Sequence, residues 1–192
     1  MAWKVGWRCA QRLGSIHDML PHGFQTPRLL LRPIGMADAE PIFDRYTQDP
    51  EVSRYMTWRP HTSIAQTRAY VNTCLAAADD RTYVLMRRTD NAIIGALDLR
   101  QSGPARLGYG YVLARASWGQ GLMTEALAEV VDWALRQPSI WRIGDVCNVE
   151  NLPSARVMEK AGLAREGILR RWEVHPNLGD LPQDCFSYAK VR

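Results

Sequence analysis

Apolar side chains occupy every second position between residues 107 and 113, and a period of two predicts a β-strand. The apolar positions are Leu107, Tyr109, Tyr111 and Leu113, with Gly108, Gly110 and Val112 between them. One face of this segment is wholly apolar, so the pattern predicts a strand with a buried face.

From residue 122 the period changes to that of an α-helix. Apolar residues recur at 122, 123, 126, 127, 130, 131 and 134, and charged residues gather on the opposite side. The helix should end before Pro138, whose ring removes a donor and clashes with the preceding turn. A shorter helix is expected after Asn151, a good N-cap, and before Gly162, which suits a left-handed cap.

The other segments complete an alternating α/β order. A hairpin is expected from residues 82–88 and 93–99, joined by Asp90-Asn91. Further strands are expected at residues 28–33, 141–147, 167–174 and 186–191, and further helices at 36–43 and 64–78.

A glycine-rich turn, residues 118–126, connects the strand predicted at residues 107–113 to the long helix that begins at residue 122. Gly119 and Gly121 let the backbone turn tightly and leave its N–H groups uncovered, just before the unpaired N–H groups of a helix start. A ligand bound there should be anionic. A nucleotide P-loop is excluded because Leu122 and Met123 stand where Lys and Ser or Thr are needed. A dinucleotide site is disfavoured because Thr124 replaces its third glycine.

Composition adds a few limits. A chain of 192 residues, with net charge +4 and pI near 9.0, fits one domain that buries roughly 70% of its unfolded surface. The basic balance suits a phosphate-rich cofactor, and no basic run with interleaved aromatics predicts nucleic-acid binding. No apolar run predicts a membrane span, and no cysteine spacing predicts a metal site. The four cysteines are typical of reduced, mostly buried thiols in a cytoplasmic protein.

The wording Trp-Gly-Gln-Gly-Leu-Met-Thr-Glu-Ala at residues 118–126 resembles the coenzyme A pyrophosphate loop of the GNAT superfamily of acetyltransferases. It is most similar to the branch that acetylates ribosomal-protein N-termini. Residues 28–33, 36–43 and 151–163 resemble that branch's first strand, first helix and second signature. The match covers about residues 26–192, which we expect to form one acetyltransferase domain after an N-terminal extension, residues 1–25.

The resemblance implies the α/β GNAT fold, with a mixed central sheet of about six to seven strands and about four helices. It implies direct transfer of an acetyl group from acetyl-CoA to a primary amine, without a metal. The amine would belong to a protein N-terminus or a small molecule, and a homodimer is also compatible with the family. The implied cofactor-binding residues are Tyr111, Val112, Leu113, Trp118, Gly119, Gln120, Gly121, Leu122, Met123, Thr124 and Asn151.

Within this set, the backbone N–H groups of residues 111–113 would bind the thioester carbonyl, and Trp118 would pack under the loop. The family's usual acid is a Tyr at the position of Met158, which cannot donate a proton. Ser154, present at this site in the ribosomal-protein branch, is the candidate substitute; its alternative role is to bond to the start of the helix.

The general base is open among four residues, Asp98, Glu125, Glu173 and His175. An α-amine titrates near 7.7–8.0 and a Lys side chain near 10.4, so a weak base favours an α-amine or another weakly basic acceptor. The acceptor should lie between residues 50–63 and residues 176–184, with Tyr55, Trp58 and Arg59 as candidate lining residues. Two alternatives remain: a CoA-binding module with impaired catalysis, and a protein that binds nucleotide phosphates.

Overall fold

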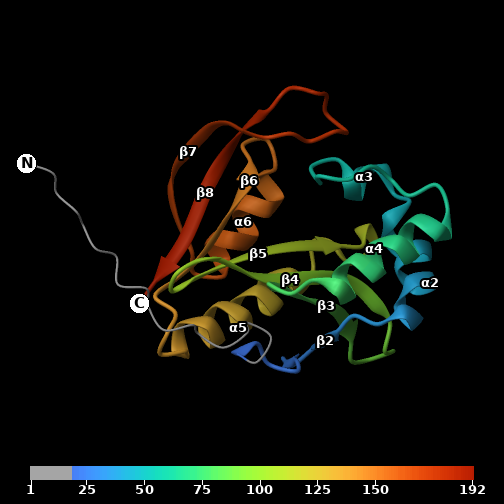
Figure 1. The fold of residues 1–192 in the computed structure, drawn as a ribbon, viewed down its shortest axis with the longest axis horizontal. Coiled ribbons are helices and arrows are strands. Elements are labelled where there is room, and N and C mark those ends of the chain that lie inside the picture. Colours follow the sequence, from blue (N-terminus) through green and yellow to red (C-terminus); the bar gives the residue numbers. More distant parts are fainter. Residues whose placement is uncertain (1–18) are drawn as a thin grey trace, which may run out of the picture.

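The computed structural model describes residues 19–192 and is built on one sheet of eight strands (Figure 1). The strands are β1 (Phe24–Gln25), β2 (Leu29–Pro33), β3 (Asp80–Arg87), β4 (Ile93–Gly103), β5 (Arg106–Leu113), β6 (Arg142–Asn148), β7 (Ala164–Glu173) and β8 (Gln183–Val191). Their spatial order is β1-β2-β3-β4-β5-β6-β8-β7. Among these described strands β5 and β6 run parallel and all other neighbours are antiparallel, so the sheet is mixed.

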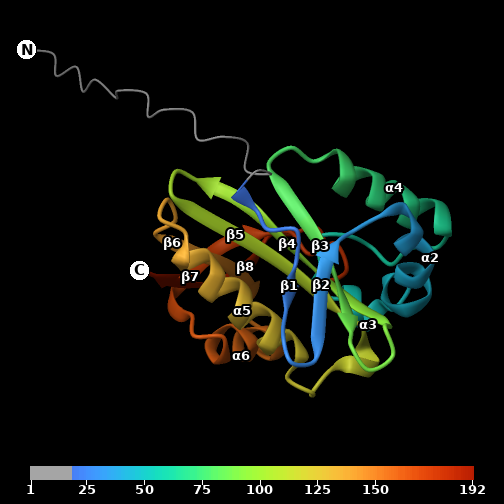
Figure 2. The ribbon, with the colours of Figure 1, turned by 90° about the horizontal axis from the view of Figure 1, so that it is seen from below.

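Helices cover both faces of the sheet, as Figure 2 shows from below. They are α2 (Ala39–Ile42), α3 (Pro50–Ser53), α4 (Ile64–Ala76), α5 (Leu122–Arg136) and α6 (Leu152–Lys160), with short turns η1 (Met36–Asp38), η2 (Phe43–Thr47) and η3 (Arg115–Ser117). Successive residues of β4 enter different cores: Leu97 packs with α5 and α6, whereas Ala96 packs with α2 and α4. The central strands are therefore buried on both faces.

The structure confirms the α/β GNAT-type fold and most of the expected elements. Within residues 19–192 it has eight strands and five α-helices, more than the expected six to seven and four. The extra strand is β1, whose two residues are too short to produce a periodic pattern. The helix expected at 36–43 is divided among η1, α2 and η2, and Pro41 lies within it without an N–H to donate.

The domain begins before residue 26. Leu20 and Phe24 are buried, and the carbonyl of Pro21 accepts a hydrogen bond from the hydroxyl of Tyr83 on β3 (2.8 Å). β1 itself pairs with β2. The expected extension is therefore partly core, and the prediction for residues 1–18 lies outside the described residues.

No helix within residues 19–192 combines the length and the apolar character needed to cross a membrane. In the same range, no three His, Cys, Asp or Glu side chains are grouped as the ligands of a metal ion would be.

Candidate active site

β5 and β6 separate after two residue pairs. Arg106 pairs with Arg142 and Leu107 with Ile143, and within the described residues the two strands share no further pair. In Figure 1, β6, β8 and β7 rise away from the plane of β3–β5. The separation leaves one edge of β5 open along residues 108–113.

Two hydrogen bonds show which side of β5 each backbone group faces. The N–H of Ala114 donates to the carbonyl of Ile94 at the start of β4 (2.8 Å). The N–H of Tyr109 donates instead to the carboxylate of Asp145 on β6 (3.0 Å). N–H groups of successive strand residues point to opposite sides, so odd-numbered residues of this strand face the gap.

The N–H groups of Tyr111 and Leu113 therefore face the gap, and that of Val112 faces β4. Of the three donors expected from the sequence, two remain available to a ligand. The carbonyl of Leu113 is already occupied, because the indole N–H of Trp118 donates to it (2.7 Å). Trp118 is 45% exposed, and its indole bond ties the loop to the end of β5.

The glycine-rich turn has the open backbone predicted for it. Gly119 and Gly121 have φ values of 73° and 71°, a left-handed region that glycine enters without strain. A Cβ on Gly119 would meet no atom within 4 Å, and one on Gly121 would meet only Arg28 at 3.7 Å. The turn is therefore an unobstructed concavity, and glycine is required there by conformation more than by space.

The start of α5 supplies further donors. Its first intrahelical bond joins the N–H of Glu125 to the carbonyl of Gly121 (3.0 Å), so the N–H groups of residues 122–124 lack helical acceptors. Leu122 and Met123 are both 3% exposed and pack in the core, which leaves only their backbones for a ligand. These residues fit a bound phosphate, as expected.

Gln120 differs from its neighbours. Its carbonyl accepts a hydrogen bond from Arg28 (2.9 Å), and its side chain folds back to the carbonyl of Ala116 (3.0 Å). It does not line the cleft described below. We therefore assign Gln120 to holding the shape of the loop.

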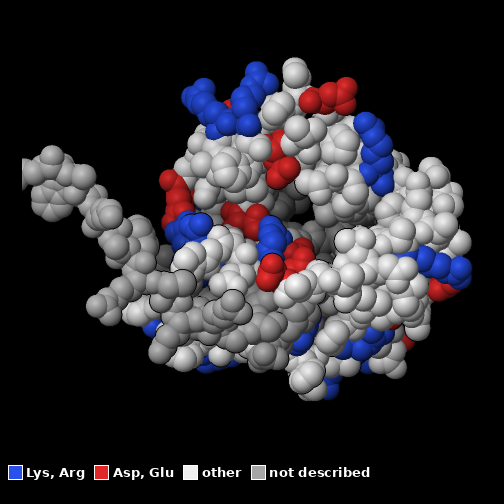
Figure 3. All heavy atoms as spheres, viewed as in Figure 1, with Lys and Arg blue, Asp and Glu red and all other residues white. Residues whose placement is uncertain are grey.

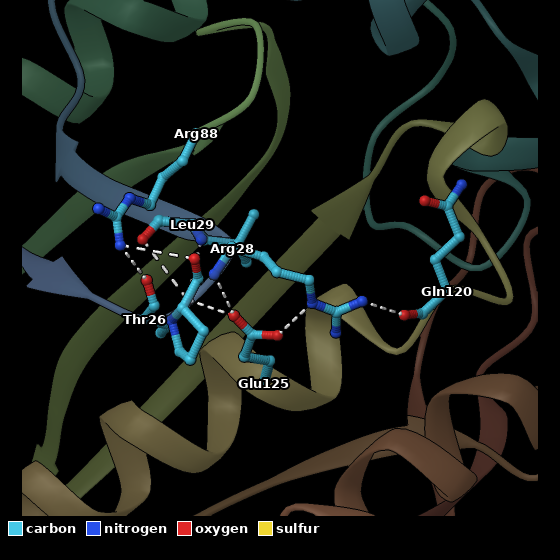
Figure 4. Close-up of polar contacts among 7 residues, drawn as sticks. Thr26, Arg28, Leu29, Arg88, Gln120 and Glu125 are labelled. Carbon is cyan, nitrogen blue, oxygen red and sulfur yellow. Dashed lines mark hydrogen bonds and ion pairs between the residues drawn. The ribbon is translucent and has the colours of Figure 1, made fainter.

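Glu125 also helps to hold the glycine-rich turn in place (Figure 4). Its carboxylate accepts hydrogen bonds from the Thr26 hydroxyl (2.5 Å), the Arg28 N–H (2.9 Å) and Arg28 Nε (2.6 Å). Burial alone would raise the pKa of Glu125, but these bonds lower it below the ordinary value. An acid held charged by three donors is a poor base, so the contacts argue against Glu125 in that role.

The gap continues into a cleft of about 670 Å³ between α3, β5, the start of α5, α6 and the end of β7. Figure 3 shows the surface hollowed between the β7–β8 side and the helical side, with acidic and basic atoms around the hollow. Most of the predicted residues line this cleft: Tyr55, Tyr111, Leu113, Trp118, Gly119, Gly121, Leu122, Met123, Thr124, Asn151 and Ser154.

Two hydroxyl groups meet in the cleft. The hydroxyl of Tyr111 lies 2.7 Å from Oγ of Ser154, so strand β5 and helix α6 are joined there. Burial raises the pKa of Tyr111, against a smaller opposing effect of Ser154, so the phenol stays protonated at neutral pH. Cys147 lies beside them, and burial raises the pKa of its thiol to about 11.

The caps predicted for α6 place Ser154 in this position. Oδ1 of Asn151 accepts a hydrogen bond from the Ser154 N–H (3.3 Å). At the other end Gly162 has φ of 88°, and the N–H of Leu163 donates to the carbonyl of Met158 (3.1 Å). Met158 is 2% exposed and belongs to the core. It thus anchors the helix, while Ser154 faces the cleft.

Charged side chains cross the floor of the gap. Arg100 on β4 donates to Asp98 and to Asp145, both at 2.5 Å. Burial raises the pKa of Asp145, although Arg100 and two backbone N–H groups oppose the shift. Asp98, a candidate base, is therefore tied to Arg100 and faces a second cavity discussed below.

Glu173 and His175 lie together at the end of β7 and line the cleft. His175 is 4% exposed, and its ring makes an edge contact with Tyr55 at 6.4 Å between centroids. Burial lowers the pKa of His175, while the charge of Glu173 raises it, so the imidazole is neutral at pH 7. Of the four candidate bases, Glu173 and His175 are the two that line the cleft containing the hydroxyl groups of Tyr111 and Ser154.

The two segments expected to flank the acceptor do meet. The amide of Asn177, in the loop between β7 and β8, donates to the carbonyls of Ser53 (2.6 Å) and Trp58 (2.8 Å). Trp58 lines the second cavity, whereas Arg59 is exposed and lines neither. The bridge by Asn177 was not predicted, because nothing in the sequence marks an amide that will meet a segment 119 residues earlier.

The side-chain roles of Tyr111, Cys147, Arg100 and Asp145 were also missed. Tyr111 was identified by its backbone alone, and its pairing with Ser154 depends on how β5 and α6 approach each other. The alternation of β5 did place Tyr111 on an apolar face. That signal could have suggested a phenol near the start of α6.

Comparisons with known proteins agree with this geometry. The sequence profile of the Acetyltransferase (GNAT) domain matches residues 28–164. The uncharacterized N-acetyltransferase YoaA of Bacillus subtilis (strain 168) is 30% identical over 173 residues, which cover 88% of this chain and 97% of that protein.

Solved structures show the same fold. An acetyltransferase (GNAT family) from Bacillus anthracis has a TM-score of 0.78 at 26% identity, covering 88% of this chain and 98% of the other. RimL, a ribosomal alpha-N-protein acetyltransferase in complex with coenzyme A, has a TM-score of 0.76 at 22% identity, covering 86% and 95%. The second likeness concerns the fold alone.

Proposed function

Since the chain belongs to the GNAT family of acetyltransferases and is an N-acetyltransferase that uses acetyl-CoA, we propose that its acceptor is a weakly basic primary amine, an α-amine above all. The main support for this proposal is the Tyr111–Ser154 hydroxyl pair at the open edge of β5, within the cleft that contains the glycine-rich turn. A proton donor, an anion cradle and free backbone donors thus share one cavity.

We assign the cradle to the pyrophosphate of coenzyme A. Support comes from the left-handed Gly119 and Gly121 and from the unpaired N–H groups of residues 122–124. Asn151 caps α6 and lines the cleft, which supports a role as a cofactor contact. The N–H groups of Tyr111 and Leu113 are the donors for the thioester carbonyl, where negative charge develops.

When bound, acetyl-CoA supplies the thioester: an N–C bond forms, the C–S bond breaks, and sulfur leaves as a thiolate that needs a proton. The Ser154 hydroxyl donates this proton and Tyr111 hydrogen-bonds to it, which restores the function of the Tyr that Met158 replaces. Because burial keeps Tyr111 protonated, the pair can donate across the neutral pH range.

We assign removal of the amine proton to Glu173. It lines the cleft, whereas Glu125 is paired with Arg28 and Asp98 lines the second cavity instead of the cleft. His175 lines the same cleft but is only 4% exposed, so a substrate can reach it less readily than Glu173, which is half-buried. A single carboxylate is a weak base, so an acceptor that titrates near 7.7–8.0 suits the site better than one near 10.4.

The fold does not select the acceptor, since one fold can serve many substrates. RimL, by its description, acts on a protein α-amine, and that is compatible with the proposal. A module with impaired catalysis is not favoured, because the relatives are N-acetyltransferases and the chain retains a donor pair. The nucleotide-phosphate alternative has no supporting residue beyond the cradle itself.

The test is release of free thiol from acetyl-CoA by the purified full chain with matched amines. Alaninamide offers only an α-amine, and Nα-acetyl-lysine amide offers only a side-chain amine. We expect a higher kcat/KM for alaninamide at pH 7.5. Turnover of the lysine derivative alone would reject the α-amine, and thiol release with neither compound nor a polyamine would reject the enzyme activity.

A further inference from the structure

A second cavity of about 320 Å³ adjoins the cleft on the α2–α4 side of the sheet. The two cavities share Met56, Gly110 and Tyr111 as lining residues, so they meet at β5. Its volume is at the lower end of the range for ligand sites, which suits one side chain more than a whole cofactor. We call it the aromatic pocket, after Tyr46, Trp58, His61 and Tyr70.

The carboxylate of Asp98 marks the junction end of the aromatic pocket. Its Oδ2 would lie 2.4 Å from a Cβ added to Gly110, so the absence of a side chain at 110 makes room for it. Oδ1 accepts a hydrogen bond from Arg100 (2.5 Å), and Oδ2 lies against Gly110, which lines both cavities. A primary amine at the junction can donate to it.

Tyr46 lines the aromatic pocket and carries a buried hydroxyl group. Tyr46 is 2% exposed, and its oxygen makes no hydrogen bond within residues 19–192. Burial raises its pKa, so it is a neutral donor without an acceptor. An unsatisfied buried donor is destabilising, and a hydrogen-bond acceptor on a ligand would remove that cost.

The other polar groups of the pocket have partners. Nδ1 of His61 lies 2.8 Å from the Thr67 hydroxyl, which is 3.3 Å from that of Thr47. Burial lowers the pKa of His61, so the ring is neutral and adds no charge. The walls are otherwise aromatic and aliphatic, and such walls favour a planar apolar group over a charged one.

We propose that the aromatic pocket binds the side chain next to the reacting α-amine, and that the acceptor carries a large aromatic side chain with a hydrogen-bond acceptor at its far end. Asp98 holds the amine at the junction, the rings enclose the side chain, and Tyr46 donates to its tip. A phenol has this combination of ring and terminal oxygen. The inference rests on the proposed function and specifies its substrate class.

Amino-acid amides test the pocket because they share one α-amine and differ only in the side chain. With the full chain and acetyl-CoA, kcat/KM should be at least about 10-fold higher for phenylalaninamide than for alaninamide, since added apolar contact is worth that much. Tyrosinamide should exceed phenylalaninamide severalfold. Equal values for the three amides would overturn the proposal while leaving the α-amine activity intact.

Variants separate the pocket from general effects. Tyr46→Phe should abolish the preference for tyrosinamide over phenylalaninamide and keep the preference for both over alaninamide. Ala96→Leu, which fills the pocket from β4, should favour alaninamide. Leu75→Ala is the control, because Leu75 is on α4 with Tyr70 but is 50% exposed. If Ala96→Leu does not fold, Trp58→Ala replaces it, and an unchanged ratio in that variant also overturns the proposal.

Discussion

The hydroxyl of Tyr111 and Oγ of Ser154 lie 2.7 Å apart, although the residues are 43 positions apart in the sequence. Tyr111 belongs to β5, whose side facing the gap is open, and Ser154 belongs to the first turn of α6. The contact joins two walls of the cleft, and Tyr111 is also among the residues that line the aromatic pocket.

If the pair acts as one donor, Ser154→Ala and Tyr111→Phe should each lower kcat by about 10²-fold, with KM for acetyl-CoA little changed. The double variant should lose hardly more than the worse single variant, because groups that act as a unit are not additive. Steady-state kinetics of the four proteins measures this. Tyr83→Phe is the control, since it removes a buried phenol bond to Pro21 far from the cleft. Full additivity would show independent roles.

A bulky substitution in the glycine-rich turn should weaken the binding of acetyl-CoA. Gly121→Val puts a branched side chain at φ of 71°, which costs about 1–2 kcal/mol, and covers the N–H groups of the cradle. We expect the Kd for acetyl-CoA, measured by calorimetry, to rise at least about 10-fold. Gly167→Ala on β7 is the matched control, because its φ is not positive and its Cβ meets no atom within 4 Å. Equal affinities in both variants would mean that the turn binds no phosphate.

The support under the turn predicts a dependence of stability on pH. The folded pKa of Glu125 is lowered, so its bonds to Arg28 and Thr26 stabilise the fold above the unfolded pKa, and this is lost as pH falls through the folded value. Glu125→Gln should lower Tm by a few degrees at pH 7, at about 2–4 °C per kcal/mol for this chain length. The difference from wild type should close once pH has fallen below the lowered folded pKa of Glu125.

Thermal melts between pH 3 and pH 8 check this, with Glu129→Gln as the comparison. Glu129 lies on the same helix and makes only a 3.6 Å ion pair with exposed Arg136. Its replacement should change Tm little at any pH. A constant Tm deficit for Glu125→Gln across the range would show that packing, and not the charge, is responsible.

Assignment of the base predicts a pH-dependent rate. Glu173→Gln should lower kcat/KM for an α-amine by about 10²-fold at pH 7. The deficit should shrink above pH 8, because the amine then loses its proton to water. Glu166→Gln on the same strand is the control, since Glu166 pairs with Arg142 and does not line the cleft. Equal rates in the two variants at pH 7 would remove Glu173 from the mechanism.

Local patterns predicted the main elements well where they depend on nearby residues. The alternation at residues 107–113 gave β5, and the period of α5 ended at Arg136, two residues before Pro138. Asn151 and Gly162 cap α6 as expected. Each of these depends on backbone chemistry within a few positions, which a single sequence contains. Elements without such a signal, β1 and the broken helix at 36–47, were missed or simplified.

The sequence by itself determined the anion cradle, because Gly119 and Gly121 need only their own backbone freedom and the start of the next helix. Tertiary structure decided which N–H groups of β5 are free, since that depends on pairing with β4 and separation from β6. It also decided that Glu125 supports the loop and that Tyr111 meets Ser154. These contacts join residues 43 to 97 positions apart, and only chain packing fixes such distances.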